Sequence, residues 1–281
     1  MITVLIEMFS YSFMLRALIV GVLVSLCSAL LGVSMVLRRS SMIGDGLSHV
    51  GFAAFAIATV LNVTPLFFAV PVCILAAFLL LRISRNSRIN ADAAIALVCS
   101  GALAVGIMAV SLTTGINTDV NNYMFGSILS LTHGDAVFSV VLSLIVIAIF
   151  VLFYNRIFSV TFDETFARAT GTGAGLYNAV LAVLTAVTVV LGMRMMGSLL
   201  ISSLIIFPPL SAMRLCKTYR GVIITSVIIS VLCFIVGIVV SFICSTPTGA
   251  SVVCMHITVF ILCTAAGRIT KVIRSGRMLK K

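Results

Sequence analysis

The sequence predicts an all-α protein that crosses a membrane about eight or nine times. Of its 281 residues, 62% are hydrophobic and only 9% are charged, which lies far outside the usage of soluble domains. The apolar runs reach the roughly 20 residues that one spanning helix needs. Short connections join them, so we expect a single membrane domain over residues 1–281, with an embedded core at 12–267 and a basic tail at 268–281.

The apolar runs predict nine spans in order. They cover residues 13–37, 44–62, 65–83, 92–114, 135–155, 175–192, 197–213, 221–244 and 250–266. The two runs on either side of residues 192–197 are either two spans or one interrupted unit, which gives nine spans or eight. The first run is longer than the apolar part of a secretory signal and carries no charge over 17–37, so we expect it to be retained.

The basic residues predict the orientation of the chain. Sixteen of the 18 Lys and Arg lie in clusters that alternate with neutral or acidic connections, and Arg16 and Arg194 are the exceptions. The positive-inside rule makes these clusters and the C-terminus cytoplasmic. The N-terminus is then outside with nine spans and inside with eight. This pattern accounts for the net charge of +11, so the expected partner is a lipid bilayer and not nucleic acid.

Asp45 and His49 form the clearest ionisable pair near an apolar run. Their spacing of four places both side chains on one face of a helix, where a carboxylate and an imidazole can bind a divalent cation. A tetrahedral zinc site needs four ligands, which two copies of the chain at a two-fold axis would supply. Alternatively, Asp45 caps the helix and His49 bonds to a backbone carbonyl. Asp45 follows Arg39 by six residues, about 9 Å of helix, which predicts a position near the inner surface unless the helix starts earlier or the segment re-enters the membrane.

The remaining histidines and the cysteines give weaker signals. His133 stands beside Asp135 in a predicted outside connection and is a candidate for metal uptake or for docking a delivery protein. His256 is alone in the last span, where a core position is favoured. The eight cysteines occur singly, without CxxC pairs. Those inside apolar runs are expected to be free, buried thiols: Cys27, Cys73, Cys99 and Cys233.

The segment 159–171 is the longest polar stretch on the predicted cytoplasmic side. It predicts a short helix that begins near Thr161 or Asp163, carries acids in its first turn and stops at Gly171. Its apolar positions recur at spacings of four and three: Phe162, Phe166 and Ala169. Such a stripe suits insertion into a groove on a partner. An interfacial helix on the membrane surface explains the pattern equally well.

Pro208 and Pro209 predict a break or kink in the run at 197–213. Irregular backbone at membrane depth is tolerated where it is buried or lines a cavity. The two prolines therefore mark either a gate or a static packing kink.

Motifs for catalysis are missing from the sequence. There is no GxxxxGK[ST] phosphate loop, no HExxH and no Ser/His/Asp set. We therefore expect no enzymatic activity, and ATP hydrolysis, where it drives the protein, must occur on another chain. An ion-coupled secondary carrier is the competing transport class, but such carriers often show inverted repeats and midplane acids, and neither is evident here.

Five motifs in order resemble the permease subunits of metal-type ABC transporters, the ABC-3 family. They are Arg38-Arg39 followed by GDGLSHVGF (44–52), DAAIAL (92–97), YMFGSILSLT (123–132), TFDETFARATG (161–171) and GSLLISSLIIFPPLSAMRL (197–215). Many relatives carry Pro-Ala where this chain has Pro208-Pro209, which leaves the shape of that kink open.

The resemblance implies an importer of zinc, manganese or iron in a prokaryotic inner or plasma membrane. It implies a homodimer, a cytosolic ATP-binding subunit and an extracytoplasmic metal-binding protein as partners, and no permanently bound cofactor. It places Asp45 and His49 on the metal path. The form GDGLSHVGF is closer to the zinc branch, which favours zinc as the transported metal. It also implies a coupling helix that contacts the ATPase through Asp163, Glu164, Phe166, Ala167 and Gly171.

Overall fold

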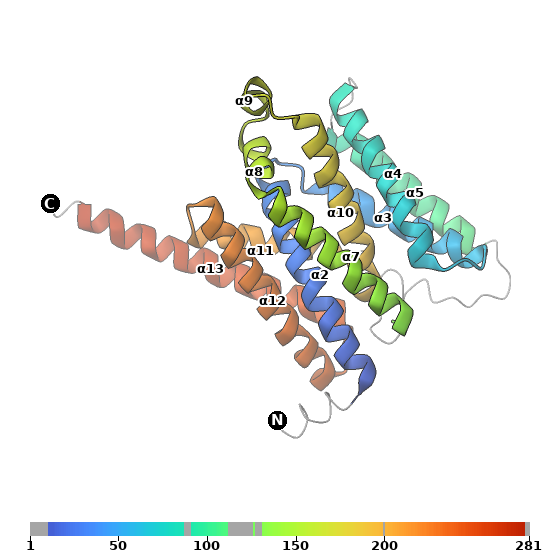
Figure 1. The fold of residues 1–281 in the computed structure, drawn as a ribbon. Coiled ribbons are helices and arrows are strands. Elements are labelled where there is room, and N and C mark those ends of the chain that lie inside the picture. The colour runs from blue at the N-terminus through green and yellow to red at the C-terminus, as the bar shows by residue number, and fades with distance from the viewer. Residues whose placement is uncertain (1–10, 87–90, 112–125, 127–130, 199, 279–281) are drawn as a thin grey trace.

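The computed structural model describes residues 11–86, 91–111, 126, 131–198 and 200–278, and their regular secondary structure is α-helical throughout (Figure 1). The helices are α2 (Ser12–Leu37), α3 (Met42–Val60), α4 (Pro65–Asn86), α5 (Ala91–Ser111), α7 (His133–Leu152), α8 (Tyr154–Phe162), α9 (Glu164–Ala169), α10 (Ala174–Met196), α11 (Ile201–Leu215), α12 (Tyr219–Cys244) and α13 (Thr248–Met278). The predicted all-α class is confirmed.

Eight of the described helices are long and apolar enough to cross a membrane. The predicted span at 197–213 corresponds to α11, which has only 15 residues. At 1.5 Å per residue it is about 22 Å long, shorter than a hydrocarbon core of about 30 Å. The chain is therefore a multi-pass membrane protein whose described residues form eight helices of spanning length and one shorter apolar helix, α11. Helix α13 also continues to Met278, so residues 268–278 of the predicted tail extend the last helix.

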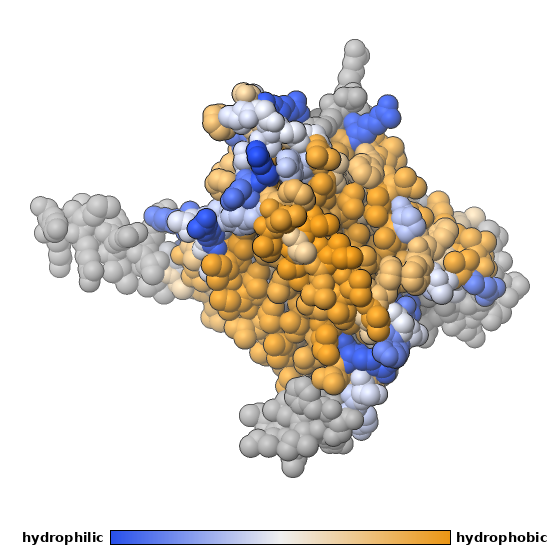
Figure 2. All heavy atoms as spheres, viewed as in Figure 1, coloured by the Kyte–Doolittle hydropathy of each residue, from blue (hydrophilic) through white to orange (hydrophobic). Residues whose placement is uncertain are grey.

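Two helices form the centre of the bundle. In the most apolar 18-residue stretch of each helix, 72% of the residues of α2 and 78% of those of α10 are buried. The share is only 17–33% in α4, α5, α7, α12 and α13. The outer helices expose large side chains such as Leu75, Leu97 and Ile261. Figure 2 shows the result as a broad hydrophobic surface across the middle of the molecule, with hydrophilic residues gathered at its margins. Such a contiguous apolar surface is suited to contact with lipid.

One end of the bundle, which we call the α9 end, gathers polar contacts between segments distant in sequence. Arg38, just after α2, pairs with Glu164 of α9 at 3.3 Å and donates a hydrogen bond to Asn178 in the first turns of α10. The hydroxyls of Ser34 and Tyr219 are 3.1 Å apart, which brings the start of α12 to the same end. The end of α2 and the starts of α10 and α12 therefore meet here.

The opposite end holds the start of α2, and Phe13 and Thr248 line a common pocket there. The guanidinium of Arg194, near the end of α10, pairs with the Asp135 carboxylate at 3.1 Å. Asp135 belongs to the first turn of α7, which begins at His133 inside the predicted connection. The ion pair explains why Arg194 departs from the basic pattern, because its charge is neutralised locally.

After α10 the chain turns back, and α11 runs toward the α9 end. Gly197, with φ of +83°, terminates α10 in a backbone conformation that side chains with a Cβ rarely adopt. Ile201 then lies against Gly192, next to Val24, which is halfway along α2. Helix α11 therefore begins inside the bundle and leads to α12 at the α9 end.

Of the predicted break or kink at the two prolines, the structure excludes the break, and the role of the prolines as a gate or a packing kink stays a prediction. Pro208 and Pro209 are buried inside α11, which runs from Ile201 to Leu215, and the break in the chain falls at Gly197 instead. Pro209 has no N–H, so the carbonyl of Ile205 lacks its usual helical partner. A Cβ built on Gly32 would lie 2.2 Å from that carbonyl oxygen and 3.0 Å from the Pro209 ring. The proline turn thus packs closely on α2 at a glycine.

We expect Gly32→Ala to destabilise the protein by about 1 to 3 kcal/mol, the usual range for overpacking. The added methyl group would meet the Ile205 backbone, which cannot move aside as a flexible side chain can. The measurement is thermal unfolding of the purified protein in detergent. The matched control is Gly101→Ala, because no atom lies within 4 Å of a Cβ at Gly101. Equal stability of the two variants would contradict the close contact between α2 and α11.

Candidate metal site

The start of α3 is directed into the bundle by a tight turn. Arg39 has φ of +56°, and its N–H bonds to the carbonyl of Val36. Helix α3 begins at Met42 and carries Asp45 in its first turn. The Asp45 carboxylate accepts a hydrogen bond from Ser202. Ser202 is the second residue of α11, and Ile201 before it packs near the midpoint of α2. The start of α11 packs beside Gly192 and Val24, so the Asp45 carboxylate is directed to the interior of the bundle. The depth of Asp45 in the membrane stays a prediction.

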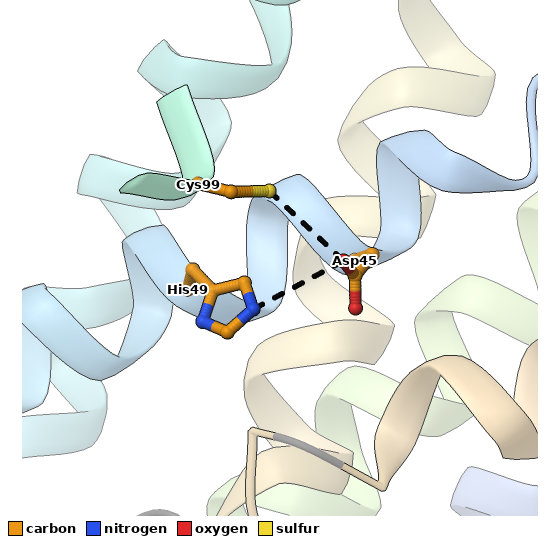
Figure 3. A group of neighbouring side chains, drawn as sticks. All are labelled: Asp45, His49 and Cys99. Atoms are coloured by element: carbon orange, nitrogen blue, oxygen red, sulfur yellow. Dashed lines mark hydrogen bonds and ion pairs between the residues drawn. The ribbon is translucent and has the colours of Figure 1, made fainter. Parts of the chain in front are cut away.

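Three potential metal ligands converge at this point (Figure 3). The Asp45 Oδ2 atom is 4.0 Å from His49 Nε2 and 4.0 Å from Cys99 Sγ, which comes from α5. All three donor atoms lie within 4.8 Å of one another. The side chains of Asp45 and His49 are 30% and 14% exposed, so the group is sheltered without being sealed. We call these three side chains the ligand cluster.

The structure lacks the contacts that a helix-capping role of Asp45 and a carbonyl-bound core position of His49 would require. The N-cap residue of α3 is Ser41, without a side-chain capping bond, and the carboxylate of Asp45 is directed to Ser202 and to the cluster. The Nδ1 atom of His49 is buried and has no hydrogen-bond partner among the described residues. His49 is therefore not a core histidine held by a backbone carbonyl, and its Nε2 faces Asp45.

Ser202 orients the carboxylate. Its hydroxyl donates to Asp45 Oδ1 at 2.8 Å, so the other oxygen, Oδ2, is the one directed to His49 and Cys99. The residue lies at the start of α11 and was not singled out by the sequence. A hydrogen bond of this kind fixes the ligand carboxylate from outside the first coordination sphere.

Sequence reasoning also missed Cys99, which was grouped with the buried thiols. Cys27, Cys73 and Cys233 are indeed buried, but Cys99 is half-buried and lies in the ligand cluster. The signal is tertiary, since 50 residues separate Cys99 from His49 and only the packing of α5 on α3 brings them together. The other two histidines lie elsewhere. His133 begins α7, and His256 is buried with Nδ1 2.8 Å from the Val252 carbonyl oxygen, as expected for a core histidine.

The polar segment folds as two helices. Asp163 separates them and caps α9, accepting a hydrogen bond from the Phe166 N–H at 2.9 Å. Gly171, with φ of +78°, ends the helix as predicted, with Thr172 N–H bonded to the Ala167 carbonyl in a Schellman arrangement. Phe162 belongs to the end of α8, so the predicted apolar stripe is divided between two helices.

Helix α9 is anchored on one side and free on the other. Ala167 is fully buried against Val160 and Ala174, and Glu164 pairs with Arg38 and Arg168. Phe166 points away from this anchor and is 63% exposed. Helix α9, at the top of Figure 1, therefore presents a large exposed apolar side chain.

The described residues form eight long apolar helices, and a carboxylate, an imidazole and a thiol converge between α3 and α5, which together define a multi-pass membrane protein with a candidate cation site. The chain belongs to the ABC 3 transport family, whose model matches residues 10–267. It is therefore a metal ABC transporter permease, and this family membership decides against the secondary carrier.

Characterised relatives include transporters of different metals. The chain is 29% identical to the high-affinity zinc uptake system membrane protein ZnuB of Haemophilus influenzae, over 90% of this chain and 97% of the relative. It is 28% identical to the manganese transport system membrane protein MntC of Halalkalibacterium halodurans, over 91% and 88%. Among solved structures, PsaBC from Streptococcus pneumoniae in complex with Fab superposes with a TM-score of 0.84 at 25% identity, over 94% and 95%. The nearly equal identities do not separate zinc from manganese.

We expect Ser202→Ala to weaken metal binding by about tenfold, at the lower end of the range for loss of an outer-shell partner. The carboxylate of Asp45 would lose the bond that directs Oδ2 to the cluster. The measurement is a zinc titration of the purified protein in detergent. Ser203→Ala is the control, one residue further along the same helix. A Ser202→Ala protein that binds zinc as tightly as the control would rule out this positioning role.

Proposed function

We propose that this chain is the membrane-spanning half of an ATP-driven importer of divalent transition metal, with zinc as the transported ion. The observation that carries the proposal is the ligand cluster within an ABC-family permease. An ionisable side chain inside a membrane protein is costly and is most often functional. A carboxylate and an imidazole that share one helix face can bind a divalent cation during its passage.

The α9 end is assigned to the cytoplasm. It carries Arg38, Arg156 and Arg168, while Arg194 near the opposite end is paired with Asp135. This charge distribution follows the positive-inside rule. With this assignment, the proposed orientation has the C-terminus in the cytoplasm and the start of α2 outside. The membrane is the inner or plasma membrane of a prokaryote, in keeping with the bacterial relatives.

Helix α9 is proposed as the coupling helix that contacts a separate ATP-binding subunit. Exposed Phe166 suits insertion into a groove on that subunit, while Asp163 and Gly171 fix the two ends of the helix. The bond from Glu164 to Arg38 connects α9 to the turn before α3. Movement of α9 on ATP binding would therefore reach the helix that carries Asp45 through one ion pair and a short turn.

Two further partners complete the proposed transporter. A second copy of the chain would form the translocation path with the first, and an extracytoplasmic metal-binding protein would deliver the ion. The permease itself performs no covalent chemistry. ATP-driven changes at the α9 end would switch the ligand cluster between access from outside and access from the cytoplasm.

Asp45→Ala and His49→Ala should each abolish uptake of radioactive zinc by cells that express the chain with its ATPase and delivery protein. Each variant removes one ligand of the transported ion. Ser48→Ala is the control, because Ser48 lies between them on α3 and bonds only within the helix, to the Asp45 carbonyl. Uptake at the wild-type rate in both ligand variants, with equal membrane expression, would refute the proposed site.

Phe166→Ala should weaken association with the ATP-binding subunit about tenfold or more, as for an exposed aromatic anchor at an interface. The measurement is co-purification of that subunit with the tagged permease. Phe162→Ala is the matched comparison, because Phe162 is 59% exposed, close to the 63% of Phe166, but lies on α8 with its ring against Phe158 and Tyr219. If the two variants retain the subunit equally, Phe166 is not the anchor.

A further inference from the structure

We propose that Cys99 is the third ligand of the transported ion and makes the site selective for zinc over manganese. This inference rests on the proposed function, since it assigns a selectivity residue within the same site. Asp45 and His49 alone separate these metals poorly, because both accept oxygen and nitrogen ligands. A thiolate is a soft ligand that favours zinc, whereas manganese favours carboxylate, carbonyl and water.

The distances between the three donor atoms are close to those that one bound metal ion requires. Bonds of about 2.0 Å to oxygen and nitrogen and 2.3 Å to sulfur, at tetrahedral angles, require donor separations of roughly 3.3 to 3.5 Å. Asp45 Oδ2 is 4.0 Å from both His49 Nε2 and Cys99 Sγ. The two edges that meet at Asp45 would have to shorten by about 0.5 to 0.7 Å, and the edge between His49 and Cys99, which is within 4.8 Å, by up to about 1.3 Å, to form three corners of a tetrahedral site. The fourth position stays open, as it does in zinc sites that exchange their ligand.

Cys99 differs from the neighbouring buried thiols in what its sulfur faces. The thiol of Cys73 is directed to the Leu47 carbonyl at 3.7 Å, and that of Cys27 to the Ser143 carbonyl at 3.5 Å. Both are ordinary core thiols bonded to backbone. The sulfur of Cys99 instead points to a carboxylate oxygen at 4.0 Å, across the space that it shares with the His49 ring (Figure 3).

The packing of α5 on α3 holds the sulfur in place. A Cβ on Gly46 would lie 3.2 Å from Ile95 and 3.8 Å from the Cys99 sulfur, so a glycine at this position lets α5 approach α3 beside Asp45. Further along, Gly106 of α5 lies against Phe52 of α3. Two glycine contacts, one on each helix, therefore fix how α5 presents its thiol. On binding, the S–H bond breaks, its proton passes to solvent and the sulfur forms the bond to zinc.

The test compares transport by wild type, Cys99→Ser and Cys99→Asp, each with the ATPase and the delivery protein, using radioactive zinc and manganese. Loss of the thiolate in Cys99→Ser should raise the KM for zinc about tenfold or more and change manganese uptake less than about twofold. Cys99→Asp supplies a carboxylate and should raise manganese uptake relative to zinc, a gain that misfolding cannot produce. Cys73→Ala is the control for loss of a neighbouring thiol.

A second readout does not depend on transport. Cobalt(II) bound to the purified permease–ATPase complex should show thiolate-to-cobalt charge-transfer absorption, which disappears in Cys99→Ser and persists in Cys73→Ala. Absence of this absorption in wild type, or an unchanged zinc-to-manganese ratio in Cys99→Ser and Cys99→Asp, would overturn the role of Cys99. If Asp45→Ala still abolishes uptake in that case, the proposed function stands. If wild type transports neither metal, the proposed function itself fails.

Discussion

The Asp45 carboxylate lies among apolar helices, where an ionised side chain is costly unless polar partners surround it. Three helices supply those partners: α3 carries Asp45 and His49, α5 carries Cys99, and α11 carries Ser202. The midpoint of α2 lies beside the start of α11. The need to surround the Asp45 carboxylate with polar partners explains how α3, α5 and α11 pack together. Helix α3 must begin inside the bundle, and α11 must begin at the same depth, for the carboxylate to reach Ser202.

Glycines make this convergence sterically feasible. In a membrane the helices gain little from hydrophobic burial against one another, so close backbone approach and van der Waals contact hold the bundle together. Gly46 brings α5 to the cluster, and Gly32 brings α2 to the proline turn of α11. A methyl group added at Gly32 would meet the Ile205 backbone, and one added at Gly46 would press on the side chain of Ile95. Such contacts change between discrete arrangements more readily than they deform, which suits a protein that must alternate its access.

Few elements connect the α9 end with the ligand cluster. The Arg38 side chain links α9 and α10, and the turn that follows it leads directly into α3. A change at α9 thus has a short covalent and ionic route to Asp45. On α9, Phe166 is exposed, whereas Ala167 is buried and attaches the helix to the rest of the chain.

The sequence by itself determined the membrane class, the long helices, the pairing of Asp45 with His49 and the cap and stop of α9, because hydrophobic run length, i,i+4 spacing and turn chemistry are local properties. It did not reveal that Cys99 and Ser202 join Asp45, that Arg194 is neutralised by Asp135, or that α11 continues through the two prolines. Those outcomes depend on which helices touch and at what depth. In a chain whose helices are apolar on nearly every face, only tertiary packing selects the contacts.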